Sequence, residues 1–298
     1  MDNLCHTLVG AALAEAGLKR YTPRATATLL IAANLPDLDA LAAFTEQGLA
    51  IRRGITHGVP ALLILPVLLA GAMILWDRWR SHSGPTVVPS RLFLLALIGV
   101  WTHPTLDWMN TYGVRWLMPV DGTWFYGDAL FIVDPWLLLL LGGGVLMARR
   151  RDVPAPARMA LVVAATYIVM MVVLTLAGRR VVREQLRLAQ TGYRDLLVAP
   201  VFAVPWRRTV LVAEAGQYRF GEIEWLPQPI VRMGGSLERG NALGDVVARA
   251  ESPGAKAFLR WARFPYYRSD GGQVVADDAR YSRRGGSFAR TTVPAAGP

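Results

Sequence analysis

Long apolar stretches that carry almost no charge dominate the first 178 residues of the chain, and they constrain its fold most strongly. Four of these stretches approach the length of about 20 apolar residues that a helix needs to cross the hydrocarbon core of a membrane. They cover residues 59–76, 91–109, 130–148 and 158–178. Two shorter stretches, 4–18 and 23–35, come first. They predict a helical hairpin that enters the bilayer only part of the way.

Composition and charge divide the chain into two parts. Only 18% of the residues are charged, against about 25% in average soluble domains, which argues against disorder and against a simple soluble enzyme. Residues 1–178 hold 13 Lys and Arg and 11 Asp and Glu, a net charge of +2, whereas residues 179–298 hold 19 and 11, a net charge of +8. The single cysteine, Cys5, rules out an internal disulfide. We therefore expect a membrane domain over 1–178 and a basic, soluble domain over 179–298.

The second part of the sequence has the alternation that is typical of strands. Residues 209–216, 218–225 and 273–282 alternate apolar with polar side chains and are rich in Val, Tyr, Phe and Trp. Residues 255–264 predict a short amphipathic helix, and 285–298 a frayed tail. The expected fold is an α-helical membrane domain of about six helices, the first two short, followed by a small, strand-rich α+β domain.

Basic residues are distributed unevenly among the loops, which predicts the orientation of a multi-pass protein. Lys and Arg are enriched in cytoplasmic loops. Ten of them lie in loops 19–24, 77–91 and 149–158, and three lie in the alternate loops. This bias places both termini and the 179–298 domain outside the cytoplasm, although three arginines after the last stretch (Arg179, Arg180 and Arg183) oppose it. No basic region precedes the first apolar stretch, so we expect no cleavable signal peptide.

Histidines and carboxylates interrupt the apolar stretches, and this topology brings them to one side of the membrane. The residues on the outer side are His6, Asp37, Asp39, His57, His103, Asp107, Asp128 and Asp134. An ionised Asp at the bilayer centre costs about 2.5–3.5 kcal/mol, so the group needs a shared cation or a polar interface. The fourth histidine, His82, falls in the opposite loop and is expected to be a solvated loop residue.

A divalent metal is the cation that fits this group best. His103 and Asp107 are four residues apart, so they lie on one helix face, where they could chelate an ion. Imidazole and carboxylate ligands suit zinc or another first-row ion. Such an ion lowers the pKa of a water ligand and generates a nucleophile. The set His6, Asp37, His57, His103 and Asp107 could hold two ions if one carboxylate bridges them.

The other polar residues have both functional and structural interpretations. Asp39 could orient a histidine, ligate the metal, act as a general base or cap a helix. Asp128 and Asp134 could be ligands, or they could cap the helix that follows. Arg53 could bind a phosphate beside the metal, since guanidinium groups match phosphate oxygens, or it could contact lipid headgroups. Asp107 could be catalytic as well as a ligand.

Four motifs carry a resemblance to a known family. They are LPDLD (35–39), RRGITH (52–57), THPTLDWMNTYGVRWLMP (102–119) and YGDALFIVDP (126–135). In their order and spacing they resemble the YdjM-like family of membrane-bound metal-dependent hydrolases over about residues 1–180. The segments PWRRTVLVAE, YRFGEIEW and DDARY resemble a C-terminal extension of some members. The resemblance implies a location in the bacterial inner membrane.

The order of the metal-binding residues is also similar to that of the zinc-dependent phospholipase C and single-strand nuclease superfamily. That similarity implies one zinc held by Asp37, His57, His103 and Asp107, and a second held by His6 and Asp107, to which Asp128 or Asp134 could contribute. The sequence lacks the N-terminal Trp and the later histidines of that superfamily. A third zinc is therefore not expected.

The sequence leaves three functions open. The first is a membrane hydrolase that cleaves a phosphoester, either in a small molecule or in a membrane lipid, at the periplasmic face. The second is a divalent metal transporter, which the clustering of the ligands at helix ends on one side disfavours. The third is a non-catalytic membrane scaffold. Nucleic acid is not favoured as a partner, because the basic residues of 179–298 are scattered rather than arranged in a stripe.

Overall fold

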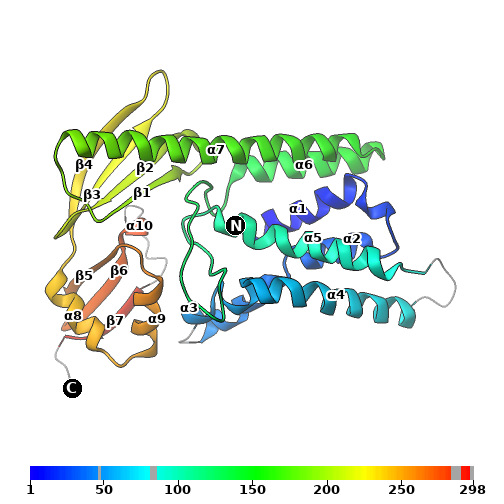
Figure 1. The fold of residues 1–298 in the computed structure, drawn as a ribbon, viewed down its shortest axis with the longest axis horizontal. Coiled ribbons are helices and arrows are strands. Elements are labelled where there is room, and N and C mark those ends of the chain that lie inside the picture. The colour runs from blue at the N-terminus through cyan, green and yellow to red at the C-terminus, as the bar shows by residue number, and fades with distance from the viewer. Residues whose placement is uncertain (46–47, 81–85, 283–289, 296–298) are drawn as a thin grey trace. The chain divides into compact units, whose positions relative to one another are not determined.

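The computed structural model describes residues 1–45, 48–80, 86–282 and 290–295, which form a mostly helical N-terminal region and a strand-rich C-terminal region (Figure 1). The helical elements of the first region are α1 (Asn3–Glu15), η1 (Leu18–Arg20), α2 (Ala25–Ala32), η2 (Leu35–Phe44), α3 (Gly48–Ile51), η3 (Ile55–His57), α4 (Val59–Arg80), α5 (Pro89–Trp108), α6 (Pro135–Arg151) and α7 (Ala155–Leu188). This arrangement confirms the predicted order of a helical region followed by a strand-rich one.

The chain divides into two compact units. The first comprises Met1–Asp39 and Arg53–Val173, and the second comprises Ala40–Arg52 and Leu174–Pro298. The boundary at Val173 falls inside α7, because the later turns of this helix pack against strands of the second unit. The polar residues predicted to bind a metal, from His6 to Asp134, all lie in the first unit.

Two helices of the described residues, α4 and α7, are long and apolar enough to cross a membrane. They contain the predicted stretches 59–76 and 158–178, and α7 continues ten residues further, to Leu188. The other two long stretches correspond to α5 and α6, and the two short ones to α1 and α2. The helices therefore form where the apolar stretches predicted them, while a membrane domain of six helices remains a prediction.

Small residues let α2 pack closely against both α1 and α5. A Cβ atom added at Gly10 of α1 would lie 2.8 Å from the carbonyl oxygen of Leu29 on α2. A Cβ added at Gly99 of α5 would lie 2.5 Å from the Cβ of Ala32. Close approach through glycine is a common way for membrane helices to pack, since van der Waals contact drives their association. These contacts place both α1 and α5 directly against the short helix α2.

Helices α6 and α7 meet at Gly144, which gives a direct test of their packing. A Cβ at Gly144 would overlap the Cβ of Ala160, whereas a Cβ at Gly143 would meet nothing within 4 Å. We expect Gly144→Ala to lower the free energy of unfolding by about 1–3 kcal/mol through overpacking. The matched Gly143→Ala should raise it by up to about 1 kcal/mol, because alanine favours helix. Thermal unfolding in detergent measures both changes. Equal shifts for the two variants would contradict the close approach of these helices.

The second unit includes α3 and the end of α7, and after α7 its described residues form two antiparallel sheets and three short helices. The elements after α7 are β1 (Asp195–Val201), β2 (Val204–Ala213), β3 (Gln217–Glu224), β4 (Ile230–Glu238), α8 (Asn241–Arg249), α9 (Pro253–Trp261), β5 (Pro265–Asp270), β6 (Gln273–Asp278), α10 (Ala279–Ser282) and β7 (Arg290–Pro294). The first sheet has the order β1-β2-β3-β4 and the second β5-β6-β7. The last turns of α7 cover one face of the first sheet, where Val182 and Leu186 pack with Val198, Val210 and Ile223.

Sequence patterns predicted three strands and one helix of this second unit, with two corrections, and did not predict β1, β4, β5, α8 or α10. The strands expected at 209–216 and 218–225 and the helix expected at 255–264 correspond to β2, β3 and α9. The strand expected over 273–282 ends at Asp278, where α10 begins. The tail expected over 285–298 was wrong for 290–294, which form β7 on β6 and bury Val293. The rest of that tail, apart from residue 295, lies outside the described residues.

Candidate metal centre

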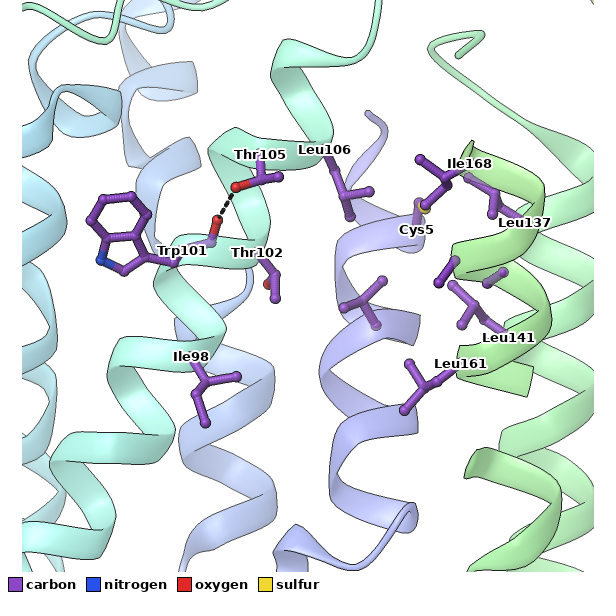
Figure 2. A pocket seen from close by; sticks show the side chains of 13 residues that line it. Cys5, Ile98, Trp101, Thr102, Thr105, Leu106, Leu137, Leu141, Leu161 and Ile168 are labelled. Atoms are coloured by element: carbon purple, nitrogen blue, oxygen red, sulfur yellow. Dashed lines mark hydrogen bonds between the residues drawn. The ribbon is translucent and has the colours of Figure 1, made fainter. Parts of the chain in front are cut away.

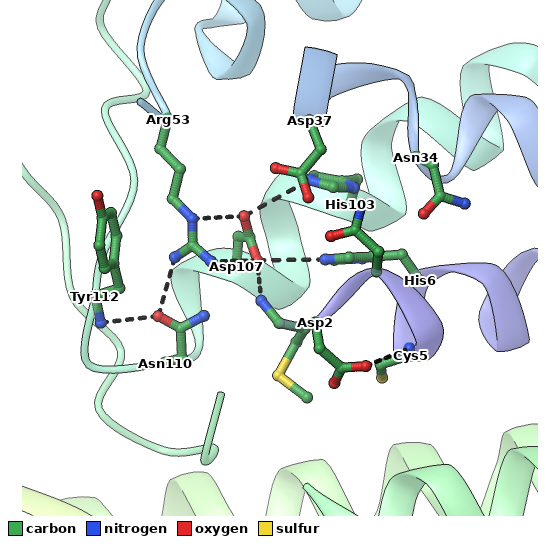
Figure 3. A network of polar contacts seen from close by, with 12 residues as sticks. Asp2, Cys5, His6, Asn34, Asp37, Arg53, His103, Asp107, Asn110 and Tyr112 are labelled. Carbon is green, nitrogen blue, oxygen red and sulfur yellow. Dashed lines mark hydrogen bonds and ion pairs between the residues drawn. The ribbon is translucent and has the colours of Figure 1, made fainter. Parts of the chain in front are cut away.

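Four buried side chains from three separate segments of the first unit converge on one point (Figure 3). Asp37 lies on η2, His57 ends η3, and His103 and Asp107 occupy the last turns of α5. Each offers one ligand atom, and these four atoms all lie within 4.8 Å of one another. The structure thus brings together the two carboxylates and two imidazoles that the sequence predicted would share a cation.

The imidazole Nε2 atoms of this centre face carboxylate oxygens. His57 Nε2 lies 3.4 Å from Asp107 Oδ2, and His103 Nε2 lies 3.6 Å from the same oxygen. Asp37 Oδ1 lies 3.5 Å from His103 Nε2 and 3.9 Å from His57 Nε2. Both Nε2 atoms are buried and have no hydrogen-bond partner within the part of the chain that the structure describes. The four ligand atoms therefore surround a space in which a single ion could bind.

The orientation of His103 is fixed by the end of α2. Its Nδ1 lies 2.7 Å from the carbonyl oxygen of Ala33, the residue that caps α2. A carbonyl only accepts hydrogen bonds, so Nδ1 carries the proton. In a neutral ring, the lone pair of Nε2 would then face Asp37 and Asp107. This is the tautomer that a metal ligand needs, because a metal ion binds the unprotonated ring nitrogen.

Asp39 organises the segment that carries His57. Its Oδ2 accepts hydrogen bonds from the backbone N–H of Arg53 at 2.7 Å and from the hydroxyl of Thr56 at 3.0 Å. The same oxygen lies 3.2 Å from His57 Nδ1. A carboxylate beside the distal nitrogen of a histidine is the usual partner of a metal-ligating imidazole. Of the interpretations that the sequence left open for Asp39, its contacts favour the one in which it orients a histidine.

The two carboxylates beside His57 favour positive charge on its ring. Burial lowers the pKa of His57, but the nearby carboxylates of Asp107 and Asp39 outweigh burial and raise it above the usual value. The cluster therefore stabilises a cation at the position of this ring. Two carboxylates and two imidazoles form the donor set that zinc and other first-row divalent ions accept. The residues present thus fit such an ion.

Arg53 supports Asp107 from the other side of the cluster. Its Nη2 donates to Asp107 Oδ1 at 2.9 Å, and its Nε lies 2.9 Å from Asp107 Oδ2. Its Nη1 donates to Asn110 Oδ1 and to the carbonyl oxygen of Gly113, both at 3.1 Å. The guanidinium also lies over the ring of Tyr112, 4.6 Å from its centroid. These contacts use most of its donors to hold Asp107 in one orientation.

Asn110 and Tyr112 are partners of Arg53 that sequence reasoning did not single out. Asn110 accepts from Arg53 and from the backbone N–H of Tyr112, at 2.8 Å in the second case. It lies just past the end of α5, in an isolated bridge with Leu130, so helical spacing from Asp107 does not identify it. Nothing in the sequence identified the cation–π contact of Tyr112, because it depends on the tertiary path of the loop.

The remaining predicted residues divide between the centre and the helix ends. His6 Nε2 lies 3.3 Å from Asp107 Oδ1, and its ring stacks on His103 with centroids 3.7 Å apart. The Met1 amine also contacts Asp107 Oδ1. Asp134 caps α6 and accepts from the backbone N–H groups of Trp136 and Leu137, as expected for a cap.

The four clustered residues do not include every residue that the sequence predicted as a metal ligand. Among the described residues, the group includes neither His6, Asp128 nor Asp134. Asp128 is fully buried and has a positive φ of 55°, but it lies outside the group.

Sequence comparison now places the protein in a family. A family model described as the YdjM inner membrane protein matches residues 1–178, which contain the whole candidate centre. The chain belongs to the YdjM inner membrane protein family. Membership and the two membrane-capable helices together indicate a membrane location.

One uncharacterized relative extends the similarity beyond the matched range of this YdjM-family chain. The uncharacterized protein YfhP of Bacillus subtilis (strain 168) is 23% identical over 229 residues, which cover 72% of this chain and 66% of YfhP. The chain thus spans about two thirds of the length of that relative. No solved structure matches the chain.

Proposed function

We propose that the protein is an integral membrane hydrolase that uses a divalent cation, with zinc as the best match, to cleave a phosphoester. The observation that carries this proposal is the orientation of the two histidines. Their Nδ1 atoms are engaged by Ala33 and Asp39, and their Nε2 atoms face the carboxylates of Asp37 and Asp107. This arrangement supports one metal held by Asp37, His57, His103 and Asp107.

Several residues around the four ligands have distinct roles in this proposal. When bound, a divalent ion would lower the pKa of a water molecule and polarise a phosphoryl oxygen. Asp39 is a positioning residue, because its Oδ2 is already engaged by three groups of the 53–57 segment. Arg53 positions Asp107, since its guanidinium is engaged by Asp107, Asn110 and Gly113. His6 lies against Asp107 and is the residue best placed to contribute to a second ion.

The placement in the membrane forms part of the same proposal. The uneven distribution of basic residues among the loops favours a multi-pass protein of the inner membrane with the site at the periplasmic face. A site at that face would meet the phosphoesters of membrane lipids as well as small phosphoesters. A lipid or small-molecule phosphoester is therefore the proposed substrate class, and nucleic acid is not favoured.

Metal content and hydrolysis test the proposal together. Purified protein in detergent should contain zinc or another divalent ion in stoichiometric amount by elemental analysis. It should hydrolyse p-nitrophenyl phosphate, bis-p-nitrophenyl phosphate or phosphatidic acid. His57→Ala should lose both the metal and the hydrolysis, because it removes one of four ligands. His82→Ala is the matched control, since the sequence places His82 in the opposite loop, and it should keep both.

Two results would overturn the proposal. One is a wild-type protein that binds no divalent ion after purification and after incubation with zinc. The other is a protein that binds the ion and moves it into proteoliposomes without hydrolysing any of the three substrates. That second result would establish the transporter in place of the hydrolase.

A further inference from the structure

An apolar cavity of about 470 Å³ lies in the first unit between α5 and α7, with α1 behind it (Figure 2). None of its lining residues belongs to the metal centre. Its deepest lining residues, Cys5, Leu137 and Leu141, are buried. Trp101, Thr105 and Ala165 lie at its edge and are exposed. The cavity therefore opens outward between the two helices.

The lining of the cavity selects a hydrocarbon. None of the residues that line it carries a charge. Its two threonines donate their hydroxyl protons to backbone carbonyls, Thr102 to Gly99 at 2.7 Å and Thr105 to Trp101 at 2.8 Å. Buried water needs two to four polar partners, which this lining does not offer. Its volume falls in the range of about 300–1,000 Å³ that is typical of ligand pockets.

The surroundings of the opening identify the hydrocarbon. One wall is α7, which is a candidate membrane span, and residues next to the lining on that helix, such as Val162 and Val169, are exposed apolar side chains. In a bilayer, the molecules that contact such a surface are phospholipids. The hydrocarbon closest to the opening is therefore an acyl chain of a glycerophospholipid.

The same helices connect this cavity to the metal centre. On α1, Cys5 of the cavity precedes His6; on α5, Thr102 precedes His103 and Leu106 precedes Asp107. Successive residues of a helix are rotated by about 100°, so the two helices present the cavity and the centre on neighbouring faces. Residues that line the cavity are thus direct chain neighbours of His6, His103 and Asp107.

We infer that the cavity binds one acyl chain of a glycerophospholipid and presents the phosphoester of that lipid to the metal centre. The binding of the chain stands on the cavity itself. The assignment of the lipid as substrate rests on the function proposed above. The experiment therefore measures binding and hydrolysis separately, so that a failure of one is distinguishable from a failure of the other.

Lipid retention tests the binding. Protein reconstituted with dioleoylphosphatidylglycerol, re-extracted into detergent and analysed by native mass spectrometry should retain bound lipid. Ala164→Phe fills the cavity from α7, and Ala165→Phe narrows its exposed edge, where extra volume is tolerated. Both should lose the retained lipid. Val162→Phe is the matched control on the same helix, because Val162 is exposed and does not line the cavity.

Hydrolysis tests the substrate assignment. Ala165→Phe should lower kcat/KM for dioleoyl phosphatidic acid by at least about tenfold, as expected when a hydrophobic pocket is blocked. Its metal content and its hydrolysis of p-nitrophenyl phosphate, which has no acyl chain, should stay within twofold of wild type, and Val162→Phe should match wild type throughout.

Each contrary result has one meaning. Equal lipid retention by wild type and both cavity variants, no retention by wild type, or retention of a polyprenyl lipid alone would overturn the acyl-chain site. Retention that follows the variants without any phosphoester hydrolysis would keep the site and reject the substrate assignment together with the proposed hydrolase.

Discussion

Asp107→Asn is expected to destabilise the metal-free protein by about 3–5 kcal/mol, because it leaves a buried cation without its counter-charge. Asp107 is fully buried, and so is Arg53, whose guanidinium contacts both carboxylate oxygens at 2.9 Å. The asparagine has nearly the same shape but no charge. The effect should therefore exceed that of most surface substitutions, which usually stay within about 0.5 kcal/mol.

Denaturant unfolding in detergent with a chelator measures this change. Asp121→Asn, at an exposed carboxylate, serves as the control and should leave the transition unchanged. Combining Asp107→Asn with Arg53→Met removes both charges, and the double variant should lose less than the sum of the two single variants. Strict additivity would show that the two residues do not interact as their contacts indicate.

Asp39→Asn is expected to weaken zinc binding by about 10- to 100-fold without removing a ligand. Its carboxylate lies 3.2 Å from His57 Nδ1 and also holds Arg53 N–H and Thr56 Oγ1. Asparagine keeps the size of the side chain but cannot stabilise a positively polarised imidazole in the same way. The ring of His57 then loses both basicity and a fixed orientation.

Competition with a chromophoric chelator measures the affinity of each variant. Asp134→Asn is the matched control, since Asp134 is also buried but caps α6 with its carboxylate. That control should lower stability and leave zinc affinity within about threefold. If Asp39→Asn and Asp134→Asn weakened zinc binding equally, Asp39 would have no special role in orienting His57.

Much of the candidate site was predictable because its residue types are out of place in their surroundings. Histidines and aspartates inside apolar stretches need compensation, and a spacing of four places His103 and Asp107 on one helix face. Strong apolar character similarly located the apolar parts of α4 and α7, although α7 extends to Leu188, beyond the predicted end at 178. These signals are local, so they can be read from the sequence without knowledge of the tertiary fold.

The contacts that orient the ligands were not predictable in the same way. Neither the carbonyl of Ala33 beside His103 nor the ring of Tyr112 over Arg53 has a sequence signature, because any residue supplies a carbonyl and many loops contain a tyrosine. The strand β7 was missed for a related reason: a short Thr- and Val-containing segment near a chain end becomes a strand only when β6 offers an edge. Tertiary pairing decides these features.

The contact between His103 and Ala33 links metal binding to the packing of α2 against α1. Ala33 ends α2, which packs against α1 through Gly10, and the side chain of Asn34 ties the same end of α2 to Thr7 of α1. A bound cation that holds the ring of His103 would also anchor this pair of helices by thermodynamic linkage. Chelation should accordingly loosen α1 and α2. The occupancy of the centre should therefore change the protease sensitivity of α2, which supplies none of the four ligands.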